Sequence, residues 1–288
     1  MRSHLFAMGA MLCLTSSLVL GGVIPAVAAQ STEKAPDFIV SNTGWTAVFA
    51  KNFETPPPGF PSTSGIGPHP DYPNFGNETG HPTPRIGNYT SPILLPWAAE
   101  QLKKTDAAIL VGGVPFDPAA RCWPAGVPAV ATFGVEPVYF IPTPTEVLII
   151  YQRGQIVRHV YMNQPHSARP TPSWYGESVG HYEGDTFVVD TIGMNDKSFV
   201  DIYNTPHTTA LHVVERYRTV DNPDGKSGKL LQDVFTVDDP GTFTKPWAAM
   251  KTFRPQSNQI EESLCQVGND DIFNQGIRPV PTAAKPDF

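Results

Sequence analysis

Short runs in which apolar and polar residues alternate follow one another closely along the second half of the chain. A period of two is typical of β-strands that bury one face. Turn residues such as Arg153-Gly154 and Asp238-Asp239-Pro240 separate the runs. The pattern predicts eight strands, at residues 146–152, 155–162, 177–182, 186–190, 210–220, 229–237, 247–253 and 259–266.

The number and spacing of these strands define the expected fold class. A sheet of this size hides its edges best by closing on itself. We therefore expect a mainly β fold, an antiparallel up-and-down β-barrel of the lipocalin-like kind at residues 145–267, followed by a C-terminal tail at residues 268–288. A β-sandwich is the alternative.

Residues 30–144 have a different composition, in which Pro and Gly are crowded together. Because Pro lacks a backbone donor and fixes φ, this region is not expected to be mostly strand or helix. Its aromatic residues, such as Trp45, give it apolar surface to bury, so we expect an ordered N-terminal wrap rather than a disordered linker. Residues 96–106 predict one short helix that buries Trp97.

Residues 1–29 have the plan of a secretory signal peptide. Arg2 and His4 precede an apolar run, and small residues allow cleavage after Ala28 or Ala29. No later segment has the ~20 apolar residues that a membrane span requires. We therefore expect an exported protein, periplasmic or secreted, without a membrane span.

Cysteine content and charge narrow the picture further. Once Cys13 has left with the signal, Cys122 and Cys265 remain, and in an oxidising compartment they most simply form one disulfide bond. A reactive thiol is the alternative. The full chain has 20 Lys and Arg against 27 Asp and Glu, a net charge of −7, and loss of Arg2 makes it one unit more negative. Such a surface suits phosphate backbones poorly, so we expect no nucleic-acid partner.

Five blocks in the second half of the chain carry a family resemblance. They are "CWPAGVP", "GESVGHYEGDTFVVDTIG", "PHTTALHVVERYR", "TVDDPGTFTKPWAA" and "EESLCQ", and they extend from Cys122 to Gln266. In this order they resemble a large group of exported bacterial proteins of unassigned function. The resemblance implies no activity and no catalytic residue, so function has to be argued from the side chains.

Alternation predicts one buried ion pair. In "LHVVERY" the face that carries Glu215 is the more apolar one, so this carboxylate should point inward, where it needs a cation or a hydrogen-bond network. If Arg153 and Gly154 form a turn, Ile149 lies opposite Arg158 in an apolar row. Arg158 and Glu215 are thus expected to pair in the lumen, either as a structural salt bridge or as part of an active site.

The hairpin at residues 176–191 carries three groups that can move protons. Glu177, His181 and Asp190 share one face, and either face of the hairpin could be the inner one. If theirs is inside, a His lies between two carboxylates, which suits general acid and base catalysis. If it is outside, the three groups form an ordinary hydrated surface, and a bulge would exchange the faces.

Two loops are expected to line a ligand entrance at one end of the barrel. The first carries His166 and Trp174, and the second carries Tyr203 and His207, with Tyr151 facing the lumen between them. We expect no metal, because the histidines lack the spacing of HxH or HExxH motifs; the alternative is a metal site formed by chance convergence of His166 and His207. No GxSxG, phosphate-loop, dinucleotide or CxxC motif is found, so we expect no organic cofactor.

Two functional hypotheses follow for a small, partly apolar organic molecule. In the first, the chain is a lyase, isomerase or hydrolase that acts by proton transfer, with His181, Glu177, Asp190, Arg158 and Glu215 as its catalytic groups. In the second, it is a lipocalin-like binding protein in which Tyr151, His166, Trp174, Tyr203 and His207 contact the ligand. Several buried titratable groups exceed what a passive binder needs, which favours the enzyme. The sequence does not determine the oligomeric state.

Overall fold

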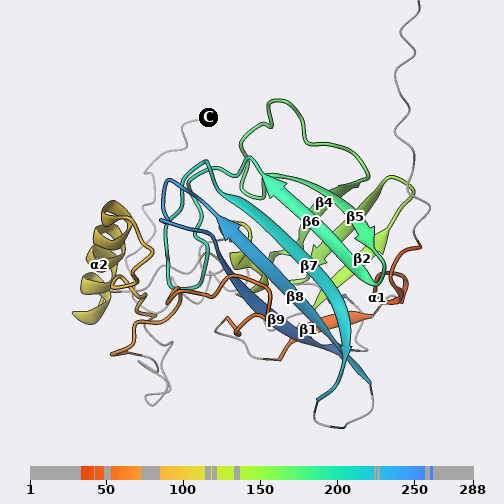
Figure 1. Ribbon diagram of the computed structural model, residues 1–288, viewed down its shortest axis with the longest axis horizontal. Helices are drawn as coiled ribbons and strands as arrows, with labels where there is room; N and C mark the ends of the chain where they lie inside the picture. The colour runs from red at the N-terminus through yellow and green to blue at the C-terminus, as the bar shows by residue number, and fades with distance from the viewer. Residues whose placement is uncertain are drawn as a thin grey trace, which may run out of the picture.

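Nine strands form a closed barrel in which neighbours in space are neighbours in sequence (Figure 1). The computed structural model describes residues 34–41, 43–48, 53–72, 85–113, 118, 122–132, 137–223, 225, 228–256 and 260–261. The strands are β1 (Gly44–Ala47), β2 (Val138–Pro142), β3 (Glu146–Tyr151), β4 (Ile156–Met162), β5 (Glu177–Glu183), β6 (Thr186–Ile192), β7 (His212–Asp221), β8 (Lys229–Asp238) and β9 (Trp247–Gln256). The predicted mainly β, closed-barrel fold is confirmed.

The helical pieces within the described residues lie outside the barrel wall. They are α1 (Asp37–Val40), α2 (Pro96–Leu110) and two 3-10 turns, Ala129–Ala131 and Arg153–Gln155. The helix α2 extends the predicted one by a turn and lies to one side of the barrel, opposite β5 (Figure 1). Trp97 is 42% exposed rather than buried, and its indole N–H donates to the Gly241 carbonyl. None of the described helices has the length and apolar character of a membrane span.

The N-terminal region contributes two strands, β1 and β2, to the barrel as well as wrapping it. Strand β1 pairs with β9 and β2, and so closes the barrel. The expected boundary at residue 145 was therefore wrong, because β1 and β2 precede it. The predicted signal peptide, the tail, Cys265 and most of the last predicted strand lie outside the described residues.

One strand pair departs from the expected antiparallel pattern. Strands β4 and β5 run parallel, whereas the other neighbouring pairs are antiparallel. The connection at residues 163–176 is long enough to carry the chain back along the barrel before β5 begins. The β4–β5 register covers only Val160–Met162 against Ser178–Gly180, so the first half of β4 lies beside this connection.

The barrel interior consists of two apolar clusters with titratable residues between them. One cluster contains Phe140, Phe187, Tyr217, Leu231 and Phe253. The other contains Val213, Phe235, Val237, Trp247 and Ala249. Along β7, β8 and β9 the inward positions between the clusters are Glu215, Asp233 and Lys251, each fully buried. A polar layer therefore crosses the middle of the lumen.

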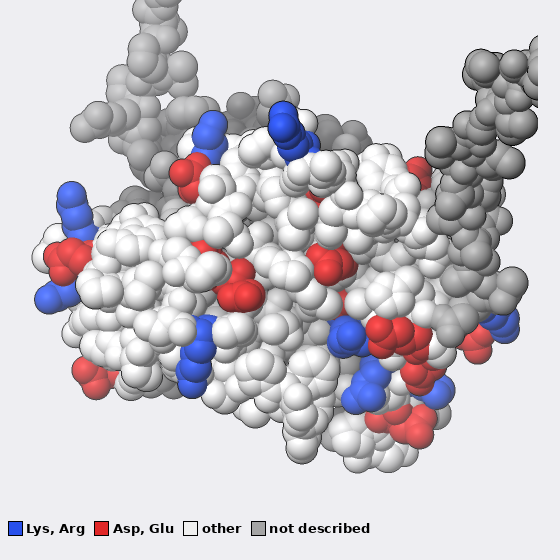
Figure 2. Space-filling model, turned by 45° about the horizontal axis from the view of Figure 1, so that its top comes forward, with Lys and Arg blue, Asp and Glu red and all other residues white. Residues whose placement is uncertain are grey.

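Charges are dispersed on the face of the molecule that Figure 2 shows. On the face shown in Figure 2, Lys and Arg are scattered among Asp and Glu without a continuous area of either sign. This distribution agrees with the acidic balance of the chain and offers no basic stripe of the kind that follows a phosphate backbone.

Candidate functional site

The lumen holds the predicted ion pair between β4 and β7. Arg158 Nη1 donates to Glu215 Oε1 at 3.0 Å, and Nη2 donates to Oε2 at 2.6 Å, so the pair is bidentate. The two side chains are almost fully buried. The expected register, with Ile149 opposite Arg158, is also observed. The inward pairing is confirmed, and a catalytic role for either residue stays a prediction.

Hydroxyl groups complete the surroundings of the pair. Arg158 Nη2 donates to Ser178 Oγ and Thr191 Oγ1, both at 3.3 Å. The Tyr217 hydroxyl donates to Glu215 Oε1 at 2.8 Å. Burial alone would lower the pKa of Arg158, but the neighbouring Glu215 carboxylate outweighs it and raises that pKa well above its usual value. The guanidinium is therefore charged at neutral pH.

Two further buried titratable groups lie in the same layer, and the sequence reasoning missed them. Burial, reinforced by the charge of Glu215, raises the pKa of Asp233 well above its usual range. Its register partner Lys251 has a pKa lowered by burial to about 8. The signal was available, because Asp233 alternates with Leu231 and Phe235 just as Glu215 alternates with its own apolar neighbours.

The hairpin β5–β6 turns its other face inward. Ser178, Gly180 and Thr191 are buried, whereas the His181 side chain is 49% exposed and bonds to Glu183 at 3.0 Å. A Cβ at Gly180 would lie only 2.7 Å from Val160 Cγ1, so this position has no room for a side chain. The face of the hairpin that carries Gly180 therefore packs directly against the core. The interpretation that placed His181 in the lumen, between Glu177 and Asp190, is therefore wrong.

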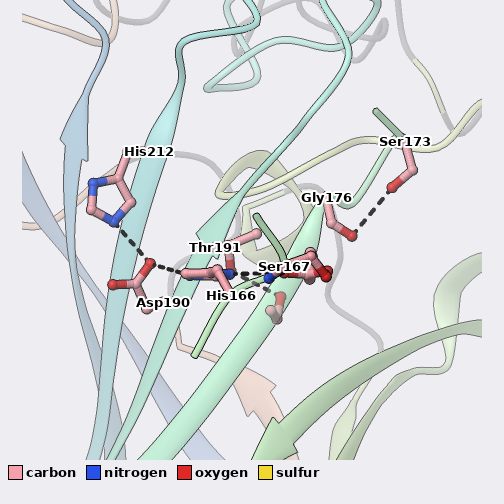
Figure 3. A network of polar contacts seen from close by, with 9 residues as sticks. His166, Ser167, Ser173, Gly176, Asp190, Thr191 and His212 are labelled. Atoms are coloured by element: carbon pink, nitrogen blue, oxygen red, sulfur yellow. Dashed lines mark hydrogen bonds and ion pairs between the residues drawn. The ribbon is translucent and has the colours of Figure 1, made fainter. Parts of the chain in front are cut away.

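A different histidine occupies the position between these two carboxylates. His166, from the β4–β5 connection, contacts Glu177 Oε1 through Nδ1 at 3.2 Å and Asp190 Oδ1 through Nε2 at 2.9 Å. His212 Nε2 contacts the same Asp190 oxygen at 2.9 Å, so that His212, Asp190 and His166 lie in a row (Figure 3). The arrangement expected for catalysis thus exists on the outer side of the barrel, with His166 in place of His181.

The electrostatics of this row keep its carboxylates ionised. Burial tends to raise the pKa of Asp190, but hydrogen bonds from His212 and His166 outweigh it and lower that pKa. Hydrogen bonds from the hydroxyl and backbone N–H of Ser167 lower the pKa of Glu177. The bond to Asp190 in turn raises the pKa of His212. The row therefore ties the β4–β5 connection to β5, β6 and β7 by charge-assisted bonds.

This connection forms one wall of a groove of about 420 Å³ beside β4. The outward residues Val157 and His159 line it, and so do the inward residues Arg158 and Ser178. The side chains of Arg158 and Ser178 are almost fully buried, so the groove lies against the outside of the wall, where β4 has not yet met β5. Gly176 at its edge has a φ of 64°, which favours glycine, and the chain turns sharply there into β5.

Four residues expected to contact a ligand do not converge at one entrance. Tyr151 is buried beside Arg158, 3.5 Å from Nη1, and Trp174 packs edge-on against Trp123. Tyr203 is buried, and His207 is held between the Ser198 hydroxyl and the Thr208 carbonyl, 2.9 Å from each. None of the four lines the groove, and the prediction of a single mouth formed by two loops was wrong.

Within the described ranges, no set of three or more His, Cys, Asp and Glu side chains is placed to hold a metal ion. The row of His166, Asp190 and His212 shares one carboxylate oxygen between two imidazoles, which is a hydrogen-bond pattern.

Comparison with known proteins does not identify the chain. It matches no family model, and no curated protein or solved structure is significantly similar to it. The functional argument therefore rests on the groove and its surroundings.

Proposed function

We propose that the protein binds a small, partly apolar organic molecule in the groove between β4 and the β4–β5 connection. One observation carries the proposal: a groove of small-molecule size lies beside β4, between this strand and the β4–β5 connection. A volume of about 420 Å³ lies within the range of about 300–1,000 Å³ that is typical of small-molecule sites. Export, which rests on residues 1–29, would place this activity outside the cytoplasm.

The composition of the walls supports a partly apolar ligand. Val157, Tyr161 and Tyr175 provide apolar surface, and the other lining residues, among them Ser167, Arg169 and Glu177, provide polar groups. The row of bonds through His166 keeps the outer wall in place without a ligand, so binding would cost little ordering of the loop.

A matched pair of substitutions tests the site. Val157→Trp should fill the groove, whereas Ile141→Trp places the same ring on another strand, at a site that is also exposed and lies outside the groove. Ligand-detected NMR with neutral aromatic fragments should show binding to the wild type and to Ile141→Trp, and loss of binding to Val157→Trp. Equal binding by all three proteins would place the ligand elsewhere and overturn the proposal.

A second candidate, an acid–base enzyme acting as a lyase, isomerase or hydrolase, is favoured by the position of His166. This imidazole lies between Glu177 and Asp190, and Glu177 lines the groove. A proton could pass along the row if a substrate displaced one bond. Binding has the stronger support, because both imidazole nitrogens are engaged and Glu177, with its lowered pKa, is a weak base.

A generic proton-abstraction substrate separates the two candidates. If His166 acts as a base, the protein should accelerate ring opening of 5-nitrobenzisoxazole, and His166→Gln should abolish the acceleration. The matched control is His181→Gln, which removes an exposed imidazole from the same surface. No acceleration by the wild type, or equal rates for the wild type and His166→Gln, would eliminate the enzyme.

A further inference from the structure

The first half of β4 has one edge that no described strand covers. Backbone N–H and C=O groups point alternately to the two sides of a strand. The Met162 N–H donates on the β3 side, and the Asn163 N–H that follows it donates to β5. By the same alternation, the N–H groups of Val157 and His159 point away from β3. Strand β5 pairs with β4 only from Val160 onwards, so it does not cover this part of the edge.

The edge is unpaired within the part of the chain that the structure describes. No described loop residue and no described side chain bonds to the Val157 backbone or to the His159 N–H. Both residues line the groove beside β4, and both are exposed, Val157 by 45%. Unpaired backbone groups at such an edge are a template for another strand. A molecule in the groove therefore lies beside accessible backbone donors and an acceptor.

An extended peptide has the complementary pattern. Along a strand, every second residue turns its N–H and C=O to the same side, at intervals of about 6.6–6.8 Å. Val157 and His159 are two positions apart in β4 and therefore have this spacing. In strand addition, main-chain bonds hold the peptide, and its side chains occupy neighbouring apolar surface. Val157, Tyr161 and Tyr175 provide that surface in the groove.

The dimensions of the groove limit the occupant to a short segment. The free part of the strand, residues 156–159, has room opposite it for about three residues of extended chain. The β4–β5 connection forms the opposite wall of the groove, whose volume is about 420 Å³. The space therefore admits a single short chain and not the sheet of a second copy.

The charges around the groove also suit a peptide. Among the described lining residues, one cation, Arg169, and one carboxylate, Glu177, are exposed or half-buried. The positive charge of Arg158 is buried and compensated by Glu215. This balance matches the opposite charges at the two ends of a free peptide, and it provides no cluster of cations for a polyanion.

We infer that the ligand of the groove is a short peptide, about three residues long, that binds in extended form and adds a strand to the free edge of β4 through Val157 and His159. The inference rests on the proposed function and specifies its ligand class: small peptides with apolar side chains.

A blocked tripeptide and its N-methylated analogue test the inference on the wild-type protein. The peptide, N-acetyl-Ala-Phe-Ala-amide, has the N–H groups that a strand donates. The analogue with methylated internal amides keeps the side chains and carbonyls, but it lacks these donors and its methyl groups hinder strand pairing. The peptide should therefore bind at least about tenfold more tightly than the analogue.

Amide resonances of the ¹⁵N-labelled protein provide the direct readout. The peptide should shift the backbone N–H resonances of Val157 and His159 and slow their hydrogen exchange. Arg158 and Val160 are the internal controls, because their N–H groups point towards β3 and should gain no protection. Affinity and the resonances are both measured on the unmodified protein, so the test does not depend on a variant that folds poorly.

The outcomes separate the inference from the proposal beneath it. Equal binding of the peptide and its analogue, unchanged resonances of Val157 and His159, or binding of aromatic fragments but not of the peptide would overturn the inference, while the groove remained a ligand site. If neither the fragments nor the peptide bound in a way that Val157→Trp abolishes, the proposed function would fail and the inference with it.

Discussion

Replacing Arg158 by Met should destabilise the protein by about 3–5 kcal/mol at neutral pH, the range measured when one partner of a buried ion pair is removed. Met has a similar length and fills the apolar part of the space. What it removes is the bidentate pair with Glu215 and the bonds to Ser178 and Thr191. Glu215 would keep the Tyr217 hydroxyl as a donor but would lose its only close cation among the described residues.

The size of the loss should depend on pH in a defined direction. In the variant, the charged form of the fully buried Glu215 carboxylate has lost its cation, whereas the protonated form needs none. Folding of the variant should therefore favour the protonated carboxyl, and its stability should fall as pH rises. The deficit should be smaller at pH 5 than at pH 7.5.

Urea unfolding at the two pH values provides the measurement, with Arg158→Met/Glu215→Leu as the matched control. The double variant removes the uncompensated charge, and the Ser178 and Thr191 hydroxyls, 2.9 Å apart, can bond to each other. It should therefore recover at least half of the loss and show little extra pH dependence. A single variant that lost less than about 1 kcal/mol, or an equal loss at both pH values, would refute the argument that an uncompensated buried carboxylate controls the effect.

Three other predictions concern separate parts of the molecule. Burial raises the pKa of Asp106 from 3.8 to about 7, so this acid contributes stability below about pH 4 that is lost as pH rises to about 7. Over that window the free energy of unfolding of the wild type, measured with urea, should fall by up to about 4 kcal/mol, and Asp106→Asn should remove this dependence on pH. An unchanged slope in the variant would contradict the assignment. His166→Ala should accelerate hydrogen exchange in the β4–β5 connection and change global stability by less than about 1 kcal/mol, because the bonds it removes are partly exposed; unchanged exchange would show that the row does not hold the connection. Mass mapping of the non-reduced protein should find Cys122 bonded to Cys265, a link worth about 3–5 kcal/mol, and two free thiols would exclude it.

Only the tertiary structure decided where the proton-moving groups meet. Residues that alternate along β5 and β6 share a face, but both faces of this hairpin carry apolar side chains, so the pattern could not say which one is inside. Packing of Gly180 against Val160 and Phe187 settled it. His166 then reached Glu177 from a loop, a contact that depends on the path of the β4–β5 connection and has no periodic signal in the sequence.

The groove beside β4 is also a product of the tertiary structure. It exists because β4 and β5 run parallel and pair over only three residues, and the direction of a strand after a long connection is a property of the whole barrel. Local alternation does not encode it. For the same reason the sequence predicted a barrel that begins too late in the chain. Strand β1 belongs to the barrel only because it pairs with β9 and β2 on either side.

The sequence by itself determined the strands from β3 to β9, the closed mainly β architecture and the inward pairing of Arg158 with Glu215. These depend on period-two alternation and on short turns, which act over neighbouring residues, and on the high free-energy cost of burying one charge alone. The tertiary structure alone decided which face of β5–β6 is buried, which histidine lies between the two carboxylates and where the groove beside β4 lies. Those features depend on contacts between segments that are distant in sequence, where packing rather than local pattern selects one arrangement.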